Sequence, residues 1–232
     1  MTDKVREFVI AAHQDLAKVQ EIYAENPDLI DAPMEWRPGQ TETPLQAAAH
    51  TGQGAIAEFL LENGATPTMV VYAMLGDEEK FNEMLAQDPE NINEIGAHNF
   101  SLMFHAAFGG NLAIIETIHQ QVPDVNLGRA LLASIMANKV EAIRWYIAHD
   151  APLTATDFRG RTALEMAVEA EDEPLISLLK EAIGEDNLES CANCGEKGSK
   201  YLAGLEGSPM GAHTKFFKCK ECDADMETRK VG

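Results

Sequence analysis

The clearest pattern along the chain is a short apolar stretch, a polar turn containing glycine, and a second stretch with apolar residues at helical spacing. It is best developed at residues 43–65, where TPLQAAAHTG is followed shortly by IAEFLLENGA. Apolar residues three and four positions apart share one face of a helix, and a glycine such as Gly64 commonly ends one. The pattern therefore predicts two short antiparallel helices joined by a tight turn.

Weaker copies of this pattern begin near residues 6, 67, 101, 129 and 162. Recurrence at a few dozen residues is typical of proteins built from stacked helical units. The segment at 43–65 closely resembles an ankyrin repeat, with Thr43 and Pro44 opening the inner helix and alanines where neighbouring helices touch. The resemblance implies a mainly α ankyrin-repeat solenoid of six copies over residues 1–185, and a protein that binds protein partners.

Long segments precede the second, fourth and sixth copies, and each contains an aromatic residue, Trp36, Phe100 or Phe158. Exposed aromatic rings anchor protein interfaces because they bury a large area at little entropic cost. On this interpretation Trp36 and Phe158 are predicted partner contacts. The alternative, that each ring folds back over the adjacent helix and fastens its own segment, stays open.

The ankyrin resemblance also implies which motif positions face the groove that holds partners. In the middle copies these positions include Met74, His105, Phe108 and Met136, which become predicted partner-binding residues. Methionine repacks against varied partners, so an adaptable apolar strip is expected there. In the alternative, degenerate copies pack tightly and bury these side chains as core.

The first 185 residues and the last 47 residues differ strongly in net charge. The net charge is −20, yet residues 186–232 hold eight acidic against seven basic side chains, so the first 185 residues carry −19. Such a surface repels phosphate backbones and favours a basic partner. Nucleic acid is therefore not expected on the larger domain.

All four cysteines lie in the last 42 positions, as two Cys-x-x-Cys pairs. Two residues between cysteines allow one knuckle to supply two ligands to a tetrahedral zinc ion. The predicted ligands of one structural zinc are Cys191, Cys194, Cys219 and Cys222. The intervening residues predict a hairpin, with strands near 200–202 and 215–218, so residues 186–232 are expected to form a small β domain that resembles a zinc ribbon.

Two disulfides or a redox pair would be the competing interpretation of these cysteines. No signal peptide is visible in the first residues, MTDK, and no apolar run approaches the ~18 residues of a membrane span. Disulfides are rare in reducing compartments. We therefore expect a cytoplasmic protein without a membrane segment.

Enzymatic motifs are missing from the sequence: it has no Gly-rich phosphate loop, no Gly-x-Ser-x-Gly and no His-Glu-x-x-His. His13 and His50 occupy equivalent positions of adjacent copies, which stack about one helix diameter, ~10 Å, apart. That spacing predicts that they cannot share a metal ion. The protein is therefore not expected to be an enzyme.

Two functions are compatible with these features. The first is an interaction protein whose helical array binds another protein. In the second, the ribbon binds DNA or RNA through the basic and aromatic segment at 215–220, although one of its two adjacent phenylalanines must face the ribbon core. The first is preferred.

Overall fold

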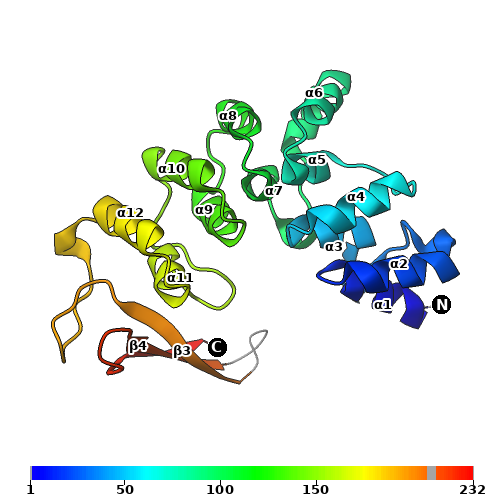
Figure 1. Cartoon of the computed structure of the whole chain (residues 1–232). Helices are drawn as coiled ribbons and strands as arrows, with labels where there is room; N and C mark the ends of the chain where they lie inside the picture. Colours follow the sequence, from blue (N-terminus) through cyan, green and yellow to red (C-terminus); the bar gives the residue numbers. More distant parts are fainter. Residues whose placement is uncertain (1, 208–212, 232) are drawn as a thin grey trace. The chain divides into compact units, whose positions relative to one another are not determined.

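The computed structural model describes residues 2–207 and 213–231. These residues form two compact units, Met1–Tyr146 and Ile147–Gly232. Helices and one short two-stranded hairpin make up the first unit, whereas the second combines helices with a three-stranded antiparallel sheet (Figure 1). The predicted mainly α fold with a small C-terminal β module is confirmed. The predicted domain division, 1–185 and 186–232, concerns which segments fold alone and stays a prediction.

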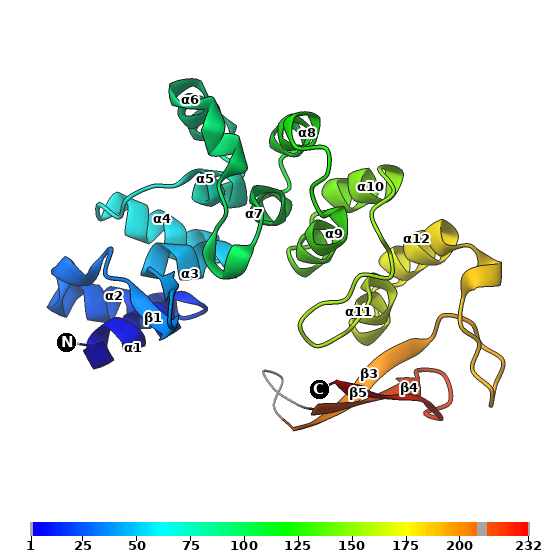
Figure 2. The ribbon, with the colours of Figure 1, turned by 180° about the vertical axis from the view of Figure 1, so that it is seen from behind.

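Paired helices follow one another through the first unit (Figure 2). The inner members of the pairs are α1 (Thr2–Ala12), α3 (Pro44–His50), α5 (Met69–Leu75), α7 (Leu102–Gly109) and α9 (Leu127–Met136). The outer members are α2 (Leu16–Glu25), α4 (Gly54–Glu62), α6 (Glu78–Gln87), α8 (Leu112–Gln121) and α10 (Val140–Ala148). Each inner helix contacts the next inner helix, so the core is continuous between neighbouring pairs.

The start of α3 shows why the best copy of the pattern folds so clearly. The Thr43 hydroxyl accepts the backbone N–H of Gln46, and the Gln46 side chain accepts the N–H of Thr43 in return. This reciprocal cap satisfies two backbone donors that the helix itself leaves free, and Pro44 has no N–H to satisfy. Gln46 departs from the ankyrin motif, yet the cap gives it a local role.

The segments between pairs are structured. The first contains a hairpin of β1 (Met34–Arg37) and β2 (Gln40–Glu42). Three short 3-10 helices complete the connections: η1 (Pro27–Leu29), η2 (Pro89–Asn93) and η3 (Ala97–Asn99). Strand β1 contacts α1, and η3 contacts both β2 and α3, so these segments fold back onto the helical array.

The second unit begins with the helix pair α11 (Ala163–Glu169) and α12 (Glu173–Ile183), followed by η4 (Glu185–Asn187). Its antiparallel sheet has the order β3-β4-β5, with β3 (Lys200–Gly207), β4 (His213–Cys219) and β5 (Asp225–Val231). The two predicted strands lie within β3 and β4, whereas β5 was not predicted. Strand β3 packs against α11, so the sheet and the last helix pair share one core.

No helix in the described ranges combines the length and the apolar character that crossing a bilayer requires.

Candidate functional site

The four cysteines converge at one end of the sheet. Cys191 and Cys194 lie in the loop before β3, Cys219 ends β4, and Cys222 lies in the turn before β5. The Sγ atoms of Cys191 and Cys222 are 3.7 Å apart, as are those of Cys194 and Cys219. Sulfur atoms about 2.3 Å from a tetrahedral ion are separated by about 3.8 Å, whereas a disulfide requires about 2.05 Å. The cluster therefore fits a four-thiolate metal site and not a pair of disulfides.

Two left-handed residues shape the knuckles. Gly195 has φ +78° and Asp223 has φ +56°. Their N–H groups donate to the carbonyls of Cys191 and Cys219 at 2.8 and 2.9 Å. Each knuckle is thus closed by a backbone hydrogen bond that turns the chain between its two cysteines.

Metal ligation requires thiolates, and the surroundings of Cys219 favour one. Burial alone would raise the pKa of this thiol. Hydrogen bonds from the Ser199 hydroxyl, 3.1 Å from Sγ, and from backbone N–H groups of the knuckle outweigh burial and lower the pKa to about 6. At neutral pH this cysteine is therefore ready to bind a cation.

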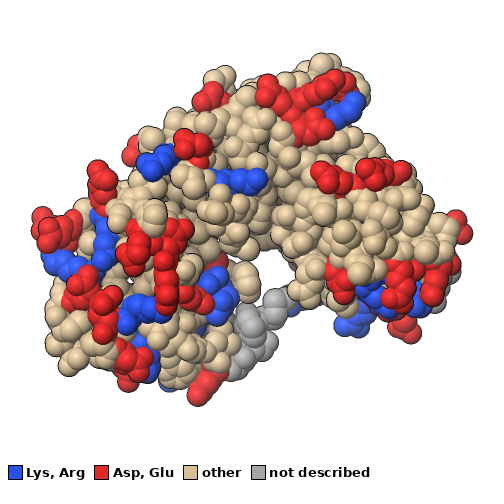
Figure 3. Space-filling view, in the orientation of Figure 1, with Lys and Arg blue, Asp and Glu red and all other residues tan. Residues whose placement is uncertain are grey.

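Most basic residues of the β module pair with carboxylates of the same unit. Lys218 pairs with Asp223 at 2.9 Å and Lys220 with Glu171 at 2.6 Å. Lys215 and Phe217, which the nucleic-acid alternative would expose, are only 4% and 1% exposed. In Figure 3 basic and acidic atoms are interspersed over this unit. It offers no continuous basic face on its visible side.

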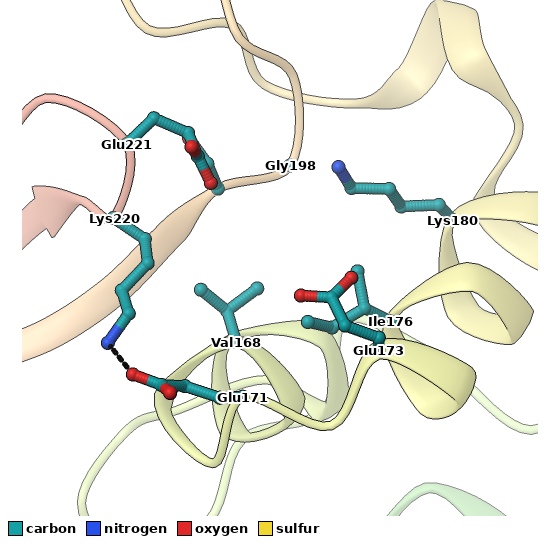
Figure 4. Close-up of a pocket in the computed structure, with 9 residues that line it drawn as sticks. Val168, Glu171, Glu173, Ile176, Lys180, Gly198, Lys220 and Glu221 are labelled. Carbon is teal, nitrogen blue, oxygen red and sulfur yellow. Dashed lines mark ion pairs between the residues drawn. The ribbon is translucent and has the colours of Figure 1, made fainter.

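A hollow of about 330 Å³ lies between α11, α12 and the loops of the β module (Figure 4). Val168 and Ile176 line its floor, and Lys180 and Lys220 approach it from different sides. Both lysines are paired, Lys220 with Glu171 and Lys180 with Glu196 at 3.2 Å. Its mixed and already compensated charge gives the hollow little selectivity for an anion.

Three of the four residues of the predicted groove strip are buried. Met74 is 3%, His105 0% and Phe108 6% exposed, so the expectation that these side chains form an exposed strip is wrong. The Phe108 ring occupies the space above Gly52, where an added Cβ would lie 2.5 Å from Cδ1 of that ring. Gly52, with φ +71°, lets the neighbouring pair approach closely, and the inner residues become core as in the alternative interpretation.

Two of the remaining predicted contacts are exposed. Met136 is 52% and Phe158 72% exposed. Phe158 lies in a loop where Asp157 accepts the N–H groups of Arg159 and Arg161. That loop holds the Phe158 ring in solvent and does not fold it back.

Trp36 and Phe100 do fold back. Trp36 is half-buried and donates its indole N–H to Glu42 Oε2 at 2.6 Å. Phe100 stacks on Phe104, with ring centroids 4.1 Å apart. Both rings fasten their own segments, which was the alternative, so the indole N–H of Trp36 is already committed.

A cluster that the sequence analysis missed surrounds Glu42. The rings of His13 and His50 are 5.0 Å apart, and those of His50 and His98 are 4.9 Å apart. The prediction that His13 and His50 lie too far apart to share an ion is therefore wrong. Helix spacing fixes the backbones, but both side chains point toward the hairpin, where Glu42 lies within 3.6 Å of each imidazole. Their equivalent motif positions were the available signal.

His105 provides a pH prediction for the first unit. It is fully buried, and burial lowers its pKa to about 4 from an ordinary 6.5. The hydrogen bond that its Nδ1 donates to the Ser101 carbonyl raises the pKa but does not outweigh burial. Because the pKa of His105 is lower in the folded than in the unfolded protein, the unfolded state binds the proton first as the pH falls. The stability present above pH 6.5 is therefore lost as the pH falls toward 4. We expect about 3 kcal/mol of unfolding free energy to be lost over that range through this residue.

Urea unfolding of the wild type and His105→Asn at pH 7 and 4.5 checks this expectation. Asparagine keeps a donor for the Ser101 carbonyl but does not titrate. The difference between the two pH values should shrink in the variant. An equal difference in both proteins would assign the acid sensitivity to other groups, such as the histidines around Glu42.

Comparison with known proteins identifies one segment of the chain. A family model for the ankyrin repeat matches residues 41–72, which run from β2 through α3 and α4 into α5. This segment is an ankyrin repeat. A search of curated proteins found no sequence that matches the chain.

Proposed function

We propose that this chain is a non-enzymatic, cytoplasmic interaction protein that binds a protein partner and folds its C-terminal module around one structural zinc ion. The ankyrin repeat at 41–72 carries the first part, because ankyrin repeats stack into surfaces that bind other proteins. The 3.7 Å spacing of the thiols supports the second part, because four thiolates favour zinc and leave no position open for catalysis.

Exposure and charge suggest the chemistry of the partner. Met136 and Phe158 are large apolar side chains that remain in solvent, and such residues serve as interface anchors. The first 185 residues carry a net charge of −19. A partner with apolar anchors and basic flanks is therefore proposed.

Nucleic acid binding by the β module is the weaker alternative. Phe217 is buried in the sheet's own core, where Arg229 lies over its ring at 4.7 Å. The nearby lysines already pair with carboxylates. Stacking of bases and contacts to phosphates would both require these groups to leave their present partners.

Capture of partners from the native cell extract tests the proposal. Met136→Ser and Phe158→Ser are each expected to weaken recovery of a specific protein by about tenfold or more, since interface anchors are typically worth over 1 kcal/mol. Recovery should also fall as salt is added, because opposite charges steer the association.

Ile95→Ser is the matched control. Ile95 is 61% exposed but is not a predicted contact, so this variant should capture partners as the wild type does. Thermal unfolding of all variants excludes loss of folding as the cause. Recovery that is indifferent to salt and to both substitutions would refute the proposed surface, and salt-sensitive recovery of nucleic acid would favour the alternative.

A further inference from the structure

The cluster around Glu42 joins four parts of the first unit. Glu42 ends β2 and is 0% exposed, His13 directly follows α1, His50 ends α3, and His98 lies in η3. His50 Nδ1 and His98 Nε2 lie 2.9 and 3.5 Å from Glu42 Oε1, while His13 Nε2 lies 3.6 Å from Oε2. One carboxylate is thus enclosed by three imidazoles that come from separate segments.

The two oxygens of this carboxylate have different environments. Oε2 accepts the Trp36 indole N–H at 2.6 Å. Oε1 is buried and accepts no hydrogen bond of good geometry in the described part of the chain, although His50 Nδ1 lies 2.9 Å and His98 Nε2 3.5 Å away. An unsatisfied buried carboxylate oxygen costs free energy and is rare in native proteins. A bound cation would satisfy it.

The hydrogen bonds of His13 and His50 determine which nitrogen of each imidazole can bind a cation. Their Nδ1 atoms lie 2.7 Å from the Val9 carbonyl and 3.0 Å from the Gln46 carbonyl. A carbonyl only accepts hydrogen bonds, so Nδ1 of each ring carries the proton and Nε2 of a neutral ring keeps its lone pair. In His13 this Nε2 is the atom that lies toward Glu42, whereas in His50 Nδ1 lies toward Glu42 Oε1, so His50 would offer an ion its other nitrogen, Nε2. Metal-binding histidines are typically fixed by this kind of hydrogen bond from the other ring nitrogen.

The distances suit a small transition-metal ion. Ligand atoms from His13, Glu42 and His50 can be chosen within 4.8 Å of one another. Nitrogen and oxygen ligands about 2.1 Å from a tetrahedral ion are separated by about 3.4 Å, close to the 3.5 Å between His98 Nε2 and Glu42 Oε1. His13 Nε2 lies 3.6 Å from the other oxygen of the same carboxylate, Oε2. Imidazoles together with one carboxylate favour zinc or a similar ion over calcium or magnesium.

We propose that His13, Glu42, His50 and His98 form a second metal site, which binds one divalent transition-metal ion of the zinc class in the first unit. Glu42 supplies Oε1 and the imidazoles supply nitrogen. The His13 and His98 side chains are 27% and 38% exposed, so an ion has a path from solvent. The ion would fasten the β1–β2 hairpin and η3 to α1 and α3.

Metal titration of the full chain tests this site, with cobalt(II) and zinc as probes after chelator treatment at pH 7.5. The wild type should bind two equivalents. One should show the intense thiolate charge-transfer absorption of cobalt bound to cysteine, and the other should lack it because its ligands are nitrogen and oxygen. Thermal unfolding of the first unit should shift upward as the second equivalent binds.

Single variants assign the second equivalent. His13→Gln, His50→Gln and His98→Gln should each weaken its binding by about 100-fold or more, while Cys219→Ser should affect only the thiolate-bound equivalent. His149→Gln, at an exposed histidine outside the cluster, should bind as the wild type does. His98→Gln is the most informative because its side chain is the most exposed of the three and its loss disturbs the core least.

Three outcomes would overturn the proposal. The wild type could bind a single equivalent, which shows thiolate absorption. The second equivalent could persist in all three histidine variants. The first unit could respond to pH but not to metal, in which case the cluster binds protons at Glu42 and the histidines. A single equivalent without thiolate absorption would instead mean that the histidine site binds metal and the cysteine cluster does not, so the two sites are judged separately.

Discussion

Removing zinc from the cysteine cluster is expected to unfold the β module while the first unit stays folded. The module's own apolar core is small, with Leu202 and Phe217 as its buried large side chains in the described strands. Zinc binding to modules of this kind contributes about 10–16 kcal/mol, which exceeds what such a core supplies. The metal-free sheet should therefore lose its cooperative structure.

Limited proteolysis and heteronuclear NMR of the full chain, with and without chelator, measure this effect. Chelator or Cys219→Ser should open residues 190–231 to cleavage, and restoring zinc should reverse the effect of chelator but not of the variant. The first unit should keep its amide signals because repeat arrays are stabilised by neighbour contacts. A metal-free protein whose β module remains protected would contradict a structural role for zinc.

The cysteine spacing was sufficient to predict the site because Cys-x-x-Cys chemistry is local. Two residues between ligands determine a knuckle, which the left-handed residues directly after each pair, Gly195 and Asp223, then close. Strand β5 was not predicted because its charged alternation resembles a solvated segment. Its hydrogen bonds to β4 are a tertiary feature, so the local pattern carries no sign of them.

The inner helices show the opposite case. Periodicity placed them, and the family motif assigned Met74 and Phe108 to an open groove. Their burial depends on how closely adjacent pairs approach, which Gly52 permits by lacking a side chain beneath the Phe108 ring. The histidines around Glu42 were missed for a related reason, because four segments distant in sequence meet there only after the hairpin folds back.

Lys200→Met is expected to lower the unfolding free energy of the second unit by about 3–5 kcal/mol. Lys200 Nζ lies 3.2 Å from Glu165, 2.6 Å from Glu189 and 2.9 Å from Glu227, and its side chain is 14% exposed. Burial would lower its pKa, but the three carboxylates outweigh burial and raise it, so the lysine stays charged. It connects α11 to the sheet through Glu165.

The cost arises from what the substitution leaves behind. Glu165 is 3% exposed, and its second oxygen already accepts the N–H of Thr162 in the cap of α11. Without Lys200 the first oxygen becomes an unpaired charge in a buried place, where water cannot compensate it. The loss should therefore exceed the value of an exposed ion pair several-fold.

Urea unfolding followed by the intrinsic signals of the second unit measures the loss, with Lys218→Met as the matched control. Lys218 extends from the same sheet, but its partner Asp223 is 72% exposed, so breaking that pair should cost under about 1 kcal/mol. Adding Glu165→Gln to Lys200→Met should recover part of the loss, because it removes the stranded charge. Equal costs for the two lysine variants, or no recovery in the double variant, would show that the pairing of Lys200 with Glu165 does not hold the sheet on α11.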